Sequence, residues 1–181
     1  ACGSGHILVY GFELFTKIYE EEGYNPSEIP QLIIEKNLFG FEIDERAAQL
    51  AGLALMMKAR SYQRRILRKE LKPNILCYQD LTLSESEIKT TLEKTNLPIP
   101  DSLINDLIEM QHISNIGSII KPLSPNDDLA KILEAIRVLK KGADLFTIQY
   151  AEQLEKSLET LLNVGNKYCC IVGNPPYMGS S

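Results

Sequence analysis

Apolar residues along the chain recur alternately at helical spacing and in short continuous runs. Between Ser4 and about Tyr24 they fit one face of a helix, which Ser4 could cap and Gly23 would end. The residues on that face are Ile7, Leu8, Phe12, Phe15 and Ile18. A second, shorter helix is expected over residues 27–36.

Three short apolar runs interrupt the helical pattern and predict strands. They lie within LFGFEID at 38–44, at Ile75–Tyr78 and at Tyr168–Val172. A helix from Glu45 to about Lys69 separates the first two strands. The order helix, strand, helix, strand predicts an α/β domain with a mostly parallel sheet.

About 85 residues separate the second and third expected strands, far more than one crossover helix needs. Their pattern predicts four helices. One opens on a capping box at Ser84–Glu87, another is capped by Asp101 and runs to Ile113. The remaining two run from Asn126, which is also expected to cap its helix, to Lys141, and from about Asp144 to Leu162. Prolines at 98, 100, 122 and 125 separate these pieces, so a helical insertion over 84–165 is expected between parts of one core at 1–83 and 166–181.

Composition narrows the class of protein. The 181 residues carry a net charge of −5, which does not indicate a DNA-binding domain, since such domains are usually basic. No apolar run approaches the ~18 residues that cross a bilayer, and no secretory signal is present, so no membrane partner and a cytoplasmic location are expected. The four cysteines lack metal-type spacing, and we expect them to be reduced.

The opening ACGSGH has the composition of a ligand-binding turn. Small residues and two glycines let a backbone approach a ligand closely, and the following helix start favours electronegative groups. Taken alone, the motif fits a simple strand-to-helix turn equally well.

Acidic residues follow the first two expected strands. Glu42 stands at the end of the first, where dinucleotide-type folds place a carboxylate that accepts from ribose hydroxyls, and Asp44 is expected to cap the next helix. Asp80 follows the second strand. Since ligands of open parallel sheets bind outside the carboxyl ends of the strands, these residues predict a ligand site there.

The segment GNPPY at 173–177 follows the third expected strand. Two prolines fix the backbone, so the Asn174 side-chain oxygen, the Pro175 carbonyl and the Tyr177 ring can form a receptor for a planar group bearing an NH2. A rigid turn is the alternative for a Pro-Pro-Tyr segment alone.

In this order ACGSG, FEID, QDL and NPPY resemble motifs I to IV of S-adenosylmethionine-dependent N6-adenine DNA methyltransferases. The opening looks like the usual (D)PACGSG with its first residues cut away. His6 and the Met-Gly after NPPY resemble the type IIG restriction-modification and PglX-type phage-defence enzymes. The resemblance covers about 1–81 and 168–179, and it implies a partial Rossmann-like class I methyltransferase core with a helical insertion between motifs III and IV.

The resemblance also implies the roles of individual residues. Glu42 would hold the ribose hydroxyls of S-adenosylmethionine and Asp80 would meet its adenine amine, with Ile43 and Leu81 on either side of the ring. The residues that would wrap its methionine part are Ala1, Cys2, Gly3 and Gly5.

The target base would meet the fourth motif. Asn174 and Pro175 would accept from N6 of a flipped adenine in double-stranded DNA, Pro176 completes the motif, and Tyr177 would stack on the base. Two acceptors localise the N6 lone pair toward the methyl group, so no general base and no metal are needed. His6 and His112 receive no role. Further partners implied through the intact protein are other restriction or defence-system subunits.

Three alternatives stay open. The basic residues Lys58, Arg60, Arg64, Arg65, Arg68, Lys69 and Lys72 could contact phosphates, although a solvated helix face is favoured. A protein glutamine N5-methyltransferase could use the same NH2 receptor. A non-catalytic fragment or binding module is the third reading, and we expect the isolated chain to be inactive and to bind the cofactor weakly or not at all.

Overall fold

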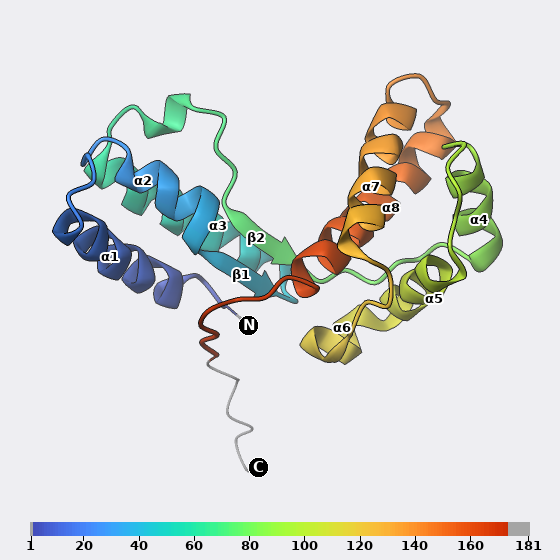
Figure 1. Cartoon of the computed structure of the whole chain (residues 1–181), viewed down its shortest axis with the longest axis horizontal. Coiled ribbons are helices and arrows are strands. Elements are labelled where there is room, and N and C mark those ends of the chain that lie inside the picture. The colour runs from blue at the N-terminus through green and yellow to red at the C-terminus, as the bar shows by residue number, and fades with distance from the viewer. Residues whose placement is uncertain (1, 174–181) are drawn as a thin grey trace, which may run out of the picture. The chain divides into compact units, whose positions relative to one another are not determined.

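Figure 1 shows the computed structural model of the chain, which describes residues 2–173. Contacts divide these residues into two units, one of residues 2–77 with 171–173 and one of residues 78–170. The first unit contains both strands, and the second is helical.

The first unit is built around a parallel pair of strands, β1 (Phe39–Glu42) and β2 (Asn74–Cys77). Phe39 lies opposite Asn74, and Glu42 lies opposite Cys77. Helix α3 (Glu45–Tyr62) connects the strands, as a parallel pair requires. Helix α1 (His6–Glu21) packs against α3, and the short α2 (Ile29–Leu32) continues as a π-helical turn over Ile33–Asn37.

Large aliphatic and aromatic side chains fill the core of this unit. Phe12 on α1, Leu55 on α3 and Ile66 on a 3-10 turn, η2 (Ile66–Arg68), are fully buried. They share one cluster with Ile33 and Ile34. Burying each such side chain contributes about 1.5–3 kcal/mol, and the amphipathic spacing read from the sequence places Phe12 on the inner face of α1.

The second unit consists of helices only. The longer ones are α4 (Glu85–Glu93), α5 (Asp101–Glu109), α7 (Asn126–Lys140) and α8 (Leu145–Val164). Between α5 and α7 lie a 3-10 turn (Met110–His112), the short α6 (Ile113–Ile116) and a second 3-10 turn (Gly117–Ile119). Helices α7 and α8 lie side by side (Figure 1). No helix within residues 2–173 is long and apolar enough to cross a membrane.

Charged residues join α7 to α8 as well as apolar ones. Arg137 donates to Glu155 at 2.9 Å and to Glu159 at 2.7 Å, and Lys140 donates to Glu155 at 2.8 Å. A carboxylate shared between two cations holds its geometry better than an isolated surface pair. The acidic residues of α8 are therefore neutralised mainly by α7.

The capping predictions divide into two groups. Asp44 and Ser84 accept backbone N–H groups at the start of a helix as expected, and Ser84 forms the full capping box with Glu87. Asp144, expected only as the start of a helix, also caps it. Ser4 is not a cap, because Gly5 takes that position and the Ser4 hydroxyl lies 3.0 Å from His6 Nδ1.

Asp101 and Asn126 do not cap their helices either. A proline, Pro100 or Pro125, occupies the capping position, so each polar residue falls inside the first turn. The helix expected from Asp101 to Ile113 ends at Glu109 and continues in shorter turns.

Two expected elements differ in extent. Helix α3 ends at Tyr62 rather than near Lys69, and Ile66 is buried from the separate 3-10 turn η2. The strand expected at Tyr168–Val172 is not formed. An apolar run becomes a strand only where a neighbour supplies ladder bonds, and Ile171 is 84% exposed.

Gly5 allows α1 to approach α3. Its φ is +90°, and a Cβ at this position would lie 2.8 Å from the Cα of Ala51 on α3. Gly23, which follows α1 as expected, has a similar φ of +78° but open space around it. An alanine would therefore suffer backbone strain at both positions, but would overlap with a neighbouring residue only at Gly5.

We predict that Gly5→Ala lowers the free energy of unfolding by about 3 kcal/mol, because left-handed strain and overlap with Ala51 add. The matched variant Gly23→Ala should lose only about 1 kcal/mol, from strain alone. Urea unfolding of the two variants measures the difference, and equal losses would contradict the packing role of Gly5.

Candidate cofactor and catalytic site

The glycine turn lies against the carboxyl end of β1. The Cys2 N–H donates to the Phe41 carbonyl at 2.9 Å, and the Gly3 N–H donates to Glu42 Oε2 at 2.7 Å. The turn closes on itself through a 3.1 Å bond from the Gly5 N–H to the Cys2 carbonyl. Two motifs separated by 39 positions are thereby joined by direct bonds.

Glu42 is a buried carboxylate, only 5% exposed, and backbone N–H groups surround it. Its Oε1 accepts from Ile43 at 2.9 Å and Asp44 at 3.3 Å, while Oε2 accepts from Gly3. Burial raises the pKa of Glu42, but the three N–H donors outweigh burial and hold the pKa below its ordinary value. The group is thus an anion at neutral pH.

The cysteines beside this carboxylate are not prepared as nucleophiles. Burial and the Glu42 charge both raise the pKa of the Cys2 thiol. Gly40 leaves room for Cys2, since a Cβ on Gly40 would lie 3.1 Å from its Sγ. Cys77 directs its thiol to the Ile43 carbonyl at 3.6 Å. The Cys2 thiol therefore packs against the core and does not supply a reactive thiolate.

Several features at this strand end suit an adenosine-type cofactor. A carboxylate offers about four lone-pair positions, and three are taken by Glu42's backbone donors, which leaves Oε2 able to accept from a hydroxyl. Gly3 has a φ of +55° with open space where a Cβ would stand. Ile43 is 59% exposed and can cover an aromatic ring. The residues present therefore fit the group that the sequence motifs imply.

Asp80 belongs to the helical unit and is held from α6. The Ser114 N–H and hydroxyl donate to its two carboxylate oxygens at 2.8 and 2.7 Å. These two bonds, the backbone one foremost, lower the pKa of Asp80. Asp80 remains exposed, so its oxygens can accept a further donor.

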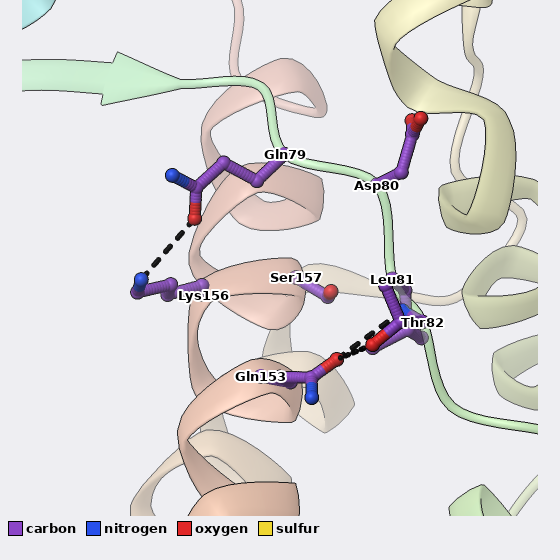
Figure 2. Close-up of a pocket in the computed structure, with 7 residues that line it drawn as sticks. All are labelled: Gln79, Asp80, Leu81, Thr82, Gln153, Lys156 and Ser157. Atoms are coloured by element: carbon purple, nitrogen blue, oxygen red, sulfur yellow. Dashed lines mark hydrogen bonds between the residues drawn. The ribbon is translucent and has the colours of Figure 1, made fainter. Parts of the chain in front are cut away.

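The segment around Asp80 lies along α8, as Figure 2 shows. Lys156 donates to Gln79 at 3.2 Å, and Gln153 accepts from the N–H and hydroxyl of Thr82 at 3.2 and 2.8 Å. Between them lies an open cavity of about 270 Å³, from which the Asp80 carboxylate points away.

Leu81 differs from Ile43 in its surroundings. It is 3% exposed, and its N–H donates to the Met110 carbonyl at 3.0 Å. Glu42 and Ile43 lie in one unit, and Asp80 and Leu81 in the other, each fixed within its own unit. The expected catalytic residues Asn174, Pro175, Pro176 and Tyr177, together with Ala1, lie outside the described residues.

Sequence reasoning missed the residues that hold the Asp80 segment. Ser114, Gln153 and Lys156 belong to no motif, and their partners stand 34 to 77 positions away. Only their polarity marks them, and polar residues on helices are usually solvated. His6 and His112, to which no role was given, are exposed.

Comparison with known proteins relates the chain to one family. Residues 36–181 match the model of the Eco57I restriction-modification methylase. The chain is 35% identical over 201 residues to an adenine-specific methyltransferase, BrxX, of Escherichia coli O9:H4 (strain HS). It is 36% identical over 188 residues to an adenine-specific methyltransferase, PglX, of Lacticaseibacillus casei (strain Zhang). Both alignments cover 99% of this chain, but only 17% and 15% of the relatives.

The Glu42 bonds generate a pH-dependent prediction. Replacement Glu42→Gln removes the charge that three N–H groups surround, and should cost about 2 kcal/mol of unfolding free energy at pH 7. Since the folded-state pKa is lowered, this stabilisation is complete above the ordinary pKa near 4.5 and is lost as pH falls further.

Urea unfolding checks this prediction when it is measured at several pH values, from pH 7 down to roughly two units below the ordinary pKa of Glu42. The exposed Glu28, which forms no side-chain cap bond, supplies the control Glu28→Gln. A difference between Glu42→Gln and the parent that stays constant from pH 4.5 down to the acid end of this range would contradict the role of the charge.

Proposed function

The chain belongs to the Eco57I restriction-modification methylase family, and from this membership we propose that it forms part of an enzyme that methylates N6 of adenine in DNA, with S-adenosylmethionine as methyl donor. The observation that carries the proposal is the bond between Gly3 and Glu42, which joins the first two motifs at one strand end. Both relatives are named adenine-specific methyltransferases, which supports the same target.

The cofactor would be held by residues at the two strand ends. Glu42 would accept from the ribose hydroxyls, Asp80 would accept from the adenine amine, and Ile43 and Leu81 would contact the ring. Cys2, Gly3, Gly5 and Ala1 would surround the methionine part. When bound, the cofactor supplies an electrophilic methyl group on a sulfonium.

The chain's own chemistry would act on the adenine amine. The N6 lone pair is delocalised into the purine ring, and acceptors on its two hydrogens favour a pyramidal nitrogen with a localised pair. The Asn174 side-chain oxygen and the Pro175 carbonyl would accept these hydrogens. Pro176 would keep the backbone rigid, and Tyr177 would stack on the flipped base.

Double-stranded DNA is the proposed macromolecular partner, and a DNA substrate would place the enzyme in the bacterial cytoplasm. Other restriction or defence-system subunits are further proposed partners. Because the chain spans 15–17% of its relatives' lengths, activity is proposed for the whole protein. We propose that residues 1–181 alone are inactive.

The alternative activities have less support. A glutamine N5-methyltransferase would use the same NH2 receptor, but both relatives are named for adenine. A binding module without catalysis would not need the NPPY segment after Gly173. Adenine methylation of DNA from cells that express the full-length protein separates the proposed function from both other readings.

We predict that Asn174→Ala in the full-length protein lowers the methylation rate at least 100-fold, because one of two N6 acceptors is lost. Affinity for S-adenosylmethionine should stay unchanged. DNA resistance to an adenine-methylation-sensitive nuclease measures activity, with the exposed Cys169→Ala as control. A variant that still methylates at the parent rate would contradict the assignment.

Ser114→Ala in the same protein should raise the dissociation constant for S-adenosylmethionine about tenfold, because Asp80 loses a hydroxyl donor and its orientation. Ser114→Thr, which keeps the hydroxyl, should restore binding, and Ser61→Ala on α3 should leave it unchanged. Isothermal titration calorimetry measures all three. Failure of the threonine variant to restore affinity would argue against positioning through the hydroxyl.

A further inference from the structure

Basic residues concentrate at the end of α3. Residues 58–72 contain seven of the chain's 19 lysines and arginines but only one of its 24 acids, Glu70. Outside this stretch the chain is strongly acidic, with 12 cations against 23 acids. The net charge of −5 therefore conceals one segment of opposite sign.

These cations do not lie on one outer helix face. Because α3 ends at Tyr62, only Lys58 and Arg60 lie on it, and the chain then turns through Arg64 and Arg65 into η2. Arg65 and Arg68 are three apart across a 3-10 turn, so they share a side. The interpretation of these charges as one solvated helix face therefore applies only to Lys58 and Arg60.

Within residues 2–173, six of the seven cations have no acidic partner, and one of these six, Lys69, bonds to an uncharged side chain instead. Lys58 pairs with Glu13, and Lys69 donates to Gln31 at 2.6 Å. Across the described part of the chain, no carboxylate lies within ion-pair distance of the remaining five cations. We name these five residues the basic turn: Arg60, Arg64, Arg65, Arg68 and Lys72. By contrast, α7 presents its Arg137 and Lys140 to carboxylates of α8.

The backbone under the basic turn is fixed. Ile66 is fully buried at its centre, and the N–H groups of Ile66, Arg68 and Lys69 each bond at 3.0 Å within the turn. The Gln63 side chain donates to the Ser27 carbonyl at 2.8 Å. Like charges are thus held together on an ordered frame, which favours an anion that several of them can share.

The basic turn and Glu42 lie at opposite ends of the two strands. Helix α3 begins beside Glu42 at the carboxyl end of β1, and the segment after it leads into the amino end of β2 (Figure 1). Its 18 residues rise about 27 Å. The proposed cofactor site is therefore out of reach of these arginines.

We propose that the basic turn binds phosphates of the DNA duplex away from the target adenine, an inference that rests on the proposed function. Guanidinium groups match phosphate oxygens in a two-pronged geometry, and four of the five residues are arginines. A span of 27 Å corresponds to roughly eight base pairs at 3.4 Å each. The turn contacts flanking duplex and carries affinity without sequence information.

The test uses the full-length protein and duplexes built around a site that it methylates in cells. Neutralising Arg64→Ser, Arg65→Ser and Arg68→Ser should weaken binding to a duplex of about 40 base pairs by roughly tenfold or more. The slope of log affinity against log salt should fall in magnitude by about two to three, near 0.9 per phosphate contact. On a duplex cut to about four base pairs on each side of the adenine, parent and variant should bind alike.

The control neutralises three cations of the helical unit, Lys89→Ser, Lys131→Ser and Lys141→Ser, with the same change in net charge, and should keep the parent's affinity and salt slope. An unchanged salt slope for the arginine variant, or an equal loss of affinity on short and long duplexes, overturns the inference. The proposed function still stands in that case if the parent methylates DNA. A parent that methylates no DNA overturns the proposed function, and the inference falls with it. Thermal melting confirms that the variants fold.

Discussion

The structure of the candidate site depends on one buried carboxylate that must have its charge satisfied. Glu42 meets this requirement through the N–H groups of Gly3, Ile43 and Asp44, so the turn before α1, the end of β1 and the start of α3 are bonded to one side chain. Leaving such a charge unpaired would cost several kcal/mol. The same bonds that stabilise the fold keep the carboxylate ionised and aligned, which is the state that accepts hydroxyl donors from a ribose.

Local sequence signals predicted most of the helices and both strands that form. Periodicity located α1, α3, α7 and α8, and the capping chemistry of Asp44 and Ser84 located two helix starts. Failures came where a tertiary or neighbouring constraint decides. Glycine and prolines took the cap positions expected for Ser4, Asp101 and Asn126, and the run at 168–172 does not form a strand.

The candidate site was predictable in a similar measure. The motif order and the strand ends singled out Glu42 and Asp80. The structure joins Glu42 to Gly3, Asp80 lies in the helical unit, and the binding roles of both stay predictions. Two contacts were not predictable: the packing of Gly5 on Ala51 and the hydrogen bond from Ser114 to Asp80. Each links residues more than 30 positions apart, and no local pattern marks it. Average charge also misled, because an acidic total hid the basic turn beside a mostly acidic remainder.

The central claim is that Glu42 holds the cofactor's ribose, and a double-mutant cycle tests it most directly. Calorimetry on the full-length protein would compare S-adenosylmethionine with its 2′-deoxyribose analogue, for the parent and for Glu42→Gln. The account predicts coupling of about 1 kcal/mol or more: the variant should lose affinity for the natural cofactor and much less for the deoxy analogue. Equal losses for both ligands would show that Glu42 supports only the fold, and would contradict the claim.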